Sequence, residues 1–351
     1  MSSRVLLITP EFYGLENKIK LTLEESGFEV VWFENKTLTF DYHGTNSKFK
    51  FLRRIYFLLF IPHINYIRKE LKKIENLRFD ILFSINGNVI CPYLFKKLKS
   101  KNPGLFSVLY LWDAFSMYFW KNELKHFNKV YTFEPVDSEK YGIEYKANFY
   151  VRSISTENQE QVYDLFFAGK FNPFRLTIID KILCKIENAN IKYFVKLWPA
   201  YKIFLHNDLI YLLLKMANFN SDWTKNYLLN YEAVEGILKK EYIIANSMSF
   251  EDMQYSFLGS NVILDLPFQG QTGYTHRLIE ALANGKKIIT TNANIKAESF
   301  FNSEQIYIID KQNPEYDFKW IKEKSTFPVD RYILTLELST WLKSIINVEI
   351  A

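Results

Sequence analysis

Apolar and polar residues alternate along the chain in blocks typical of strands joined by helices. The run RVLLIT at residues 4–9 is followed by a Pro/Gly loop, and residues 15–27 then repeat apolar positions at helical spacing. A second apolar run, FEVVWFE, follows directly at residues 28–34. This order of strand, loop, helix and strand predicts the start of an open parallel α/β sheet.

The same alternation continues through the first half of the chain. Strand-like runs are FDILFSING at residues 79–87, LFSVLYLWDAF at residues 105–115 and KVYTFEP at residues 129–135, with helical patterns between them. The region between residues 48 and 73 is basic, aromatic and helical in pattern, with an interruption at Pro62. We therefore predict a Rossmann-like domain at residues 1–150.

The pattern starts again near residue 150, which predicts a second α/β domain at residues 151–328. It opens with YDLFFAGK at residues 163–170, a helix and a further strand. After an aromatic stretch without a clear assignment, three more strands are expected, within KKEYIIANSMSFED (239–252), NVILDLPFQ (261–269) and KKIITTNA (286–293). Residues 329–351 have helical periodicity, and this helix could pack back on the N-terminal domain.

Length and composition agree with two folded domains and restrict the kind of protein. The chain has 351 residues, of which 48% are hydrophobic and 24% charged. The N-terminus lacks a signal-peptide pattern, and no run of ~18 apolar residues suggests a membrane span. We expect a cytoplasmic protein. The net charge of +5 suits an anionic substrate or an anionic membrane surface.

Metal and nucleic-acid chemistry find no support in the residue spacing. The two cysteines are far apart and form no Cys-x-x-Cys motif, and the five histidines show no ligand spacing. Nothing resembles a nucleic-acid-binding module. We therefore expect no metal, no other cofactor and no nucleic-acid partner.

The stretch GQTGYTHRLIEALANGKKIITTN at residues 270–292 is the most informative segment. A helix is expected from about Thr275 to Ala283, so a polar loop precedes its N-terminus, where unpaired N–H groups favour anions. The Thr272, Thr275 and Arg277 side chains could meet a pyrophosphate there. One turn into the helix, Glu280 could accept hydrogen bonds from the hydroxyls of a ribose. The alternative is that the threonines cap the helix, Gly273 is a turn residue and Glu280 is a solvated charge.

The segment LIEALANGKKII at residues 278–289 resembles the shared segment of GT-B fold glycosyltransferases. More narrowly, residues 163–182, the segments around LYLWDAF and FNKVYTFEPVDSEKYGIEY, and residues 271–292 resemble bacterial lipopolysaccharide-core, capsule and exopolysaccharide biosynthesis proteins. These are related to the CgeB-like glycosyltransferases. The resemblance implies two Rossmann-like domains facing across a cleft, with Glu280 on the ribose of a sugar nucleotide.

One departure from the resembled pattern affects the donor contacts. Many retaining GT-B enzymes carry a second glutamate, separated by seven residues from the ribose-binding one, and Thr272 stands at that position. The contact would then come from the Thr272 hydroxyl, the Gly273 backbone or the Gln271 side chain. The resemblance therefore leaves open whether the reaction retains or inverts the anomeric configuration.

Basic residues in the loop AGKFNPFR could neutralise the donor phosphates. Lys170 and Arg175 follow the first strand of the second domain, where they could stabilise a leaving nucleoside diphosphate. A solvated basic turn is the alternative. His276 could bond a phosphate or a sugar hydroxyl, or be a capping residue. All of these residues are candidate donor contacts.

Two carboxylates of the N-terminal domain are candidates for the base that deprotonates the acceptor hydroxyl. Asp113 ends a very apolar strand, where partial burial would raise the pKa of its carboxyl, and Glu11 follows the first strand near Gly14. Asp113 could instead cap the next helix or pair with a basic side chain. Glu134 and Asp137 are interpreted first as structural residues in a turn that leads into a helix.

These observations together predict a metal-independent glycosyltransferase that moves a sugar from a nucleotide-sugar donor to a hydroxyl of a surface glycan, lipopolysaccharide or lipid-linked oligosaccharide. The segment between residues 48 and 73 could contact the inner face of an anionic cytoplasmic membrane. It could equally be a surface helix with one buried face. A sugar-nucleotide epimerase and a non-catalytic scaffold of a polysaccharide assembly complex are the alternative functions.

Overall fold

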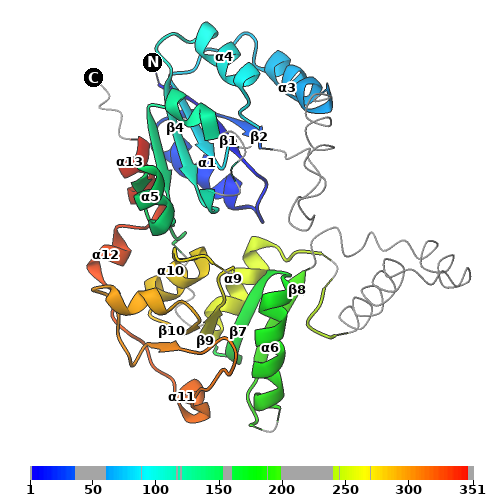
Figure 1. Ribbon diagram of the computed structural model, residues 1–351, viewed down its shortest axis with the longest axis vertical. Helices are drawn as coiled ribbons and strands as arrows, with labels where there is room; N and C mark the ends of the chain where they lie inside the picture. The colour runs from blue at the N-terminus through cyan, green and yellow to red at the C-terminus, as the bar shows by residue number, and fades with distance from the viewer. Residues whose placement is uncertain are drawn as a thin grey trace, which may run out of the picture. The chain divides into compact units, whose positions relative to one another are not determined.

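A computed structural model describes residues 2–35, 61–87, 89–115, 118, 121–152, 160–187, 189–198, 240–244, 246–268 and 270–346. The chain folds into two compact units (Figure 1). Unit 1 comprises Met1–Arg152, Gln271–Ile279 and Arg331–Ala351, and unit 2 comprises Ser153–Gly270 and Glu280–Asp330. Residues 271–279, which the sequence assigned to the second domain, therefore pack with unit 1.

Unit 1 is built on a six-stranded sheet with the strand order β2-β1-β3-β4-β5-β6. All of the strand pairs in this sheet are parallel. The strands are β1 (Arg4–Thr9), β2 (Glu29–Glu34), β3 (Ile81–Ile85), β4 (Phe106–Leu111), β5 (Lys129–Thr132) and β6 (Glu144–Tyr145). Connecting segments are α1 (Leu15–Glu25), α3 (Ile61–Lys73), α4 (Pro92–Lys101), the 3-10 helix η3 (Lys121–His126) and α5 (Pro135–Tyr141).

Both faces of this sheet are covered, as the continuous apolar character of its strands predicts. Leu82 of β3 is buried in a core cluster that includes Leu94 and Leu98 of α4. Its neighbour Phe83 points to the opposite face, where its ring centroid lies 6.5 Å from that of Trp341. Successive strand side chains alternate between the two layers, so one strand serves two cores.

The C-terminal segment completes unit 1. Its helical pattern is divided between α12 (Arg331–Leu334) and α13 (Leu338–Ile346), because the backbone between them bonds to Tyr150. Trp341 of α13 is fully buried, and its indole nitrogen donates a 2.9 Å hydrogen bond to the Ala147 carbonyl. Its ring also packs edge-on against Tyr110 at 4.7 Å.

Unit 2 has a five-stranded sheet with the order β11-β10-β9-β7-β8, and its strand pairs are also parallel. The strands are β7 (Tyr163–Lys170), β8 (Tyr193–Trp198), β9 (Ser260–Asp265), β10 (Lys287–Thr290) and β11 (Ile306–Ile308). The helices are α6 (Pro173–Ile186), α9 (Phe250–Leu258), α10 (His276–Ala283), which begins in unit 1, the 3-10 helix η4 (Ala293–Ala297) and α11 (Phe318–Lys322). The two predicted parallel α/β sheets are thus confirmed.

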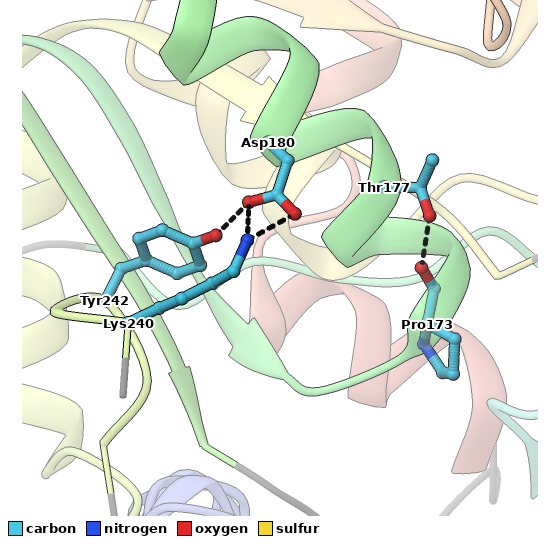
Figure 2. Close-up of polar contacts among 5 residues, drawn as sticks. All are labelled: Pro173, Thr177, Asp180, Lys240 and Tyr242. Atoms are coloured by element: carbon cyan, nitrogen blue, oxygen red, sulfur yellow. Dashed lines mark hydrogen bonds and ion pairs between the residues drawn. The ribbon is translucent and has the colours of Figure 1, made fainter. Parts of the chain in front are cut away.

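The strand expected within residues 239–252 is not formed by residues 240–244 and 246–252, which the structure describes, and this prediction was wrong. Among these residues only Ile243 pairs with β8, through an isolated bridge to Leu197, and Ser249 already caps α9 by accepting from the Asp252 amide. The flanking polar residues turn toward α6 instead. Figure 2 shows Lys240 and Tyr242 converging on the Asp180 carboxylate, with the Lys240 Nζ 2.6 Å from Oδ1.

The predicted membrane-facing segment is described only in part, since residues 48–60, with Arg53 and Arg54, lie outside the described residues. In α3, Ile67 is fully buried in the core of unit 1, while Lys69, Lys72 and Lys73 are exposed. The apolar face of α3 is therefore used in packing. Across the ranges described here, no helix is both long and apolar enough to cross a bilayer.

Candidate functional site

The carboxyl edge of the sheet in unit 1 carries strained backbone after two neighbouring strands. Tyr13, in the loop after β1, has φ 56°, and Asn86, at the end of β3, has φ 58°. Each is followed by a glycine that is also left-handed, Gly14 and Gly87. Non-glycine residues in this region cost energy and cluster at functional sites. This edge is therefore the first candidate for a binding site.

Asn86 uses its unusual conformation to hold the loop after β4. Its Nδ2 donates a 2.6 Å hydrogen bond to Oδ2 of Asp113, and its Oδ1 accepts from the Trp112 amide at 3.1 Å. The carboxylate of Asp113 is thus held in a fixed orientation at half-buried exposure. Glu11, the other candidate base, is exposed in the loop after β1. Of the two carboxylates, Asp113 has the more organised surroundings.

Aromatic rings cluster around Trp112, the residue that precedes Asp113. The ring of Phe12 is 39% exposed and lies 5.3 Å from that of Trp112 and 4.5 Å from that of Tyr13, measured between centroids. Trp112 in turn packs edge-on against the His276 imidazole at 5.6 Å. Partly exposed rings next to a fixed carboxylate offer both an apolar surface and a hydrogen-bond acceptor to a ligand.

Residues Gln271–Ile279 are anchored to unit 1 by a buried carboxylate. Glu134 is 3% exposed and accepts hydrogen bonds from the amides of Thr272, at 3.0 and 3.1 Å, and Gly273, at 3.0 Å. The Thr272 hydroxyl also bonds to the Glu134 carboxylate. Burial raises the pKa of Glu134, and the amide hydrogen bonds oppose that rise. Two predicted phosphate-binding residues therefore already hold an anion.

The next residues of the loop make further contacts within unit 1. The Asn148 side chain donates to the Tyr274 carbonyl at 2.9 Å, and Nδ1 of His276 lies 3.0 Å from the Phe149 carbonyl. That contact identifies Nδ1 as the protonated nitrogen of the neutral ring. Burial lowers the pKa of His276 to about 4, and its buried Nε2 has no hydrogen-bond partner among the described residues. His276 is therefore a neutral acceptor at physiological pH.

The remaining loop residues keep mixed roles. The Thr275 hydroxyl accepts from the Leu278 amide at 3.1 Å, which is the capping role considered as the alternative. Helix α10 begins at His276, one residue after the predicted start. Gln271 and Arg277 are half-buried in the same segment, and both have contacts of their own.

In unit 2, the predicted basic residues lie at the carboxyl end of β7. Lys170 is the last residue of β7 and is exposed, whereas Arg175, in the first turn of α6, is 6% exposed. The Arg175 guanidinium donates to the Leu266 carbonyl at 2.8 Å and the Lys170 carbonyl at 3.1 Å, and its Cζ lies 4.0 Å from the centre of the Phe268 ring. Arg175 thus joins β7, α6 and the loop after β9.

Glu280, the candidate ribose ligand, belongs to unit 2 and is half-buried on α10. Its Oε1 accepts a 3.1 Å hydrogen bond from the side chain of Gln254 on α9. Gln254 was not among the residues predicted from the sequence. Polar residues at the carboxyl ends of β9 and β10 were not predicted either, and there Thr290 donates to the buried Asp265 at 3.1 Å. The signal was present, because both strands end in polar residues after an apolar run.

Within the described ranges, no group of three or more His, Cys, Asp or Glu residues could hold a metal ion.

No family model matches the sequence, and no curated protein matches it. The comparison with solved structures is more informative. The α,α-trehalose-phosphate synthase (UDP-forming) of Burkholderia xenovorans, solved with glucose-6-phosphate, is similar with a TM-score of 0.53 and 9% identity. The similarity covers 98% of this chain and 99% of that chain.

This chain has the GT-B fold. The similarity spans both α/β units of the chain and nearly the whole of the solved enzyme. Two further solved structures are also similar. They are the α,α-trehalose 6-phosphate synthase of Burkholderia multivorans, at TM-score 0.49, 9% identity and 99% and 96% coverage, and the Neisseria meningitidis UDP-GlcNAc 2-epimerase bound to UDP-GlcNAc, at 0.48, 11% and 98% of each chain. At 9% identity, the similarity to the Burkholderia xenovorans enzyme establishes the fold alone.

Proposed function

We propose that this protein is a glycosyltransferase that uses a nucleotide sugar as donor and a hydroxyl of a surface polysaccharide, lipopolysaccharide or lipid-linked oligosaccharide as acceptor. The observation that carries the proposal is Glu280. It is half-buried on α10, the helix that follows β9 and precedes β10 in the sequence, and Gln254 orients its carboxylate. A carboxylate in a nucleotide site of an α/β protein can accept hydrogen bonds from the hydroxyls of a ribose.

The GT-B fold and the basic residues support the same function. Solved proteins with this fold include a UDP-forming trehalose-phosphate synthase. Lys170 is exposed at the carboxyl end of β7, where ligands bind in parallel α/β sheets, and its charge would neutralise a donor phosphate. Arg175 would contribute positive potential at the same edge, although its N–H groups also serve backbone carbonyls.

The proposed reaction assigns the base to Asp113. The acceptor hydroxyl gives its proton to the Asp113 carboxylate while its oxygen forms a bond to the anomeric carbon of the donor. The bond from that carbon to the phosphate oxygen breaks, and the nucleoside diphosphate leaves with the electron pair. Lys170 and Arg175 stabilise the charge that develops on the departing phosphate, so the scheme uses no metal. Retention would require a different sequence of bond changes.

A nucleotide-binding screen tests the donor site. We expect a rise in the unfolding midpoint with one of UDP, GDP, CMP or dTDP and with its sugars, and we expect Glu280→Ala to abolish it. A ligand present at 100 times its Kd adds about 2.7 kcal/mol of stability, which is a shift of several degrees in a chain of this size. Glu251→Gln, an exposed carboxylate on α9, is the matched control.

Absence of any shift in the wild-type protein would contradict the donor assignment and favour a scaffold. Conversion of the nucleotide sugar without an added acceptor would identify an epimerase instead.

A separate prediction concerns binding of the acceptor by Trp112, the residue next to Asp113. We expect Trp112→Ala to raise the acceptor KM about 3- to 10-fold with a small change in donor KM, because a ring contact contributes roughly 0.5–1.5 kcal/mol. Initial rates at varied acceptor concentration measure this. An unchanged acceptor KM would remove Trp112 from the acceptor site. Exposed Tyr255→Ala on α9 is the aromatic control.

A further inference from the structure

The strongest polar cluster outside the assigned reaction is centred on Glu134. Its carboxylate follows β5 and is 3% exposed, and two successive amides and one hydroxyl of the loop before α10 donate to it. No ion pair involves this carboxylate in the described part of the chain. A buried carboxylate without a cation is costly unless hydrogen bonds replace its hydration. The hydrogen bonds from the loop amides therefore replace the water that would otherwise hydrate the Glu134 carboxylate.

The backbone at Gly273 leaves no room for a side chain. A Cβ added to Gly273 would lie 2.4 Å from the Phe133 carbonyl oxygen, so only glycine fits against the residue preceding Glu134. On the other side of the turn, the buried Asn148 side chain holds the Tyr274 carbonyl. The turn is thus fixed by contacts before and after it. Its conformation depends on the carboxylate in the middle.

The turn leads directly to the proposed donor ligand. Residues Gln271–Ile279 belong to unit 1, and Glu280, the next residue, belongs to unit 2 on the same helix. Because α10 is continuous across this point, the orientation of its first turn and that of Glu280 are coupled. A residue that fixes the turn therefore influences where the carboxylate of Glu280, the proposed ribose ligand, lies.

We propose that Glu134 is a positioning residue for the nucleotide-sugar donor, an inference that rests on the proposed function. Glu134 holds the Thr272 and Gly273 amides and so sets the start of α10 and the position of Glu280. Those two amides consequently have a structural role as hydrogen-bond donors to Glu134. Other groups then contact the phosphates of the nucleotide sugar, and among the proposed ones Lys170 is exposed to solvent. This assigns a function to a residue that the sequence pattern presented as part of a turn.

The opposite role is a carboxylate that occupies the anion site of the loop and must leave before a donor phosphate binds. The two roles predict opposite changes in nucleotide affinity when Glu134 is replaced. Removal of a positioning residue weakens nucleotide binding, whereas removal of a competing anion strengthens it. The 3% exposure of Glu134 and the contacts on either side of the turn favour positioning, because departure would open a packed region.

The test compares wild type, Glu134→Gln, Glu134→Ala and the control Glu139→Gln, an exposed carboxylate on α5, the helix that begins directly after Glu134. Amide hydrogen exchange of residues 271–279 reports the turn, and calorimetric titration with UDP, GDP, CMP and dTDP reports the donor site. For Glu134→Ala we expect faster exchange and about tenfold weaker nucleotide binding, because the loop loses the charge-assisted hydrogen bonds that hold it. Glu134→Gln should give exchange rates and affinities between those of wild type and Glu134→Ala, because its amide oxygen still accepts hydrogen bonds from the loop.

The measurements separate positioning from general stabilisation. A positioning role raises donor KM more than it lowers kcat and is partly rescued in Glu134→Gln, which preserves side-chain volume if the alanine variant fails to fold. Tighter nucleotide binding in either variant overturns the proposal, as does faster exchange with unchanged affinity. If wild type binds none of the four nucleotides, the proposed function fails. The exchange data then decide alone whether Glu134 fixes the turn.

Discussion

Replacement of Asp113 by asparagine is expected to lower kcat by about 10²- to 10⁴-fold, the usual contribution of a general base. Asparagine keeps the shape of the side chain and can still bond to Asn86, whose Nδ2 donates to Oδ2 of Asp113. The substitution removes the negative charge and with it the ability to take a proton. Turnover of the donor found in the nucleotide screen, with a surface-polysaccharide fraction as acceptor, measures the effect.

Glu11→Gln identifies the base if the assignment is mistaken. Glu11 is exposed in the loop after β1, whereas Asp113 is half-buried and held by Asn86. Loss of activity in Glu11→Gln together with full activity in Asp113→Asn would transfer the role to Glu11. Nucleotide affinity should stay at the wild-type value in Asp113→Asn, because the base belongs to acceptor chemistry. The exposed Glu139→Gln is the control for an ordinary carboxylate change in unit 1.

His276 predicts a specific loss of stability in acid. The pKa of this imidazole is lowered from 6.5 to about 4 in the folded protein, because burial disfavours the charged ring. The unfolded chain then binds more protons than the folded chain between these two values. The free energy of unfolding should therefore fall as the pH decreases from about 6.5 to about 4, by up to about 3 kcal/mol from this residue.

His276→Asn isolates that contribution. The asparagine amide can still donate to the Phe149 carbonyl, but it does not titrate in this range. Denaturant unfolding at several pH values should give a difference between wild type and variant that changes steadily from about pH 6.5 to pH 4. His126→Asn, at an exposed position in η3, should keep the wild-type slope. A pH-independent difference for His276→Asn would mean that the ring is not held neutral.

The fold was predictable because local patterns determine most of it. The run YDLFFAGK is apolar on both faces of a strand, and it forms β7 at Tyr163–Lys170 in the interior of its sheet. Helix α10 was predicted to within one residue from its polar start and the Gly285 stop. The apolar run at residues 242–245 shows the limit of this reasoning, since its described residues 242–244 form no strand.

The anchoring of the donor loop could not be predicted from local patterns. The residues that meet there, Glu134 and Thr272, are separated by 138 positions. Each has an ordinary local explanation, one as a turn residue before α5 and the other as a helix cap. Only the three-dimensional packing brings the carboxylate to the two amides. The sequence therefore indicates candidate residues, but it does not indicate the contacts that hold them in the structure.

The division of unit 1 among three stretches of sequence has a consequence for how the protein is made. Trp341 is fully buried against Phe83, Tyr110 and Phe149, yet it is synthesised after the whole of unit 2. Residues 1–152 leave the ribosome without this indole and without residues 271–279, so the apolar face around Phe83 stays uncovered until residues 331–346 have been synthesised. Unit 2, although second in sequence, has all of its residues available first.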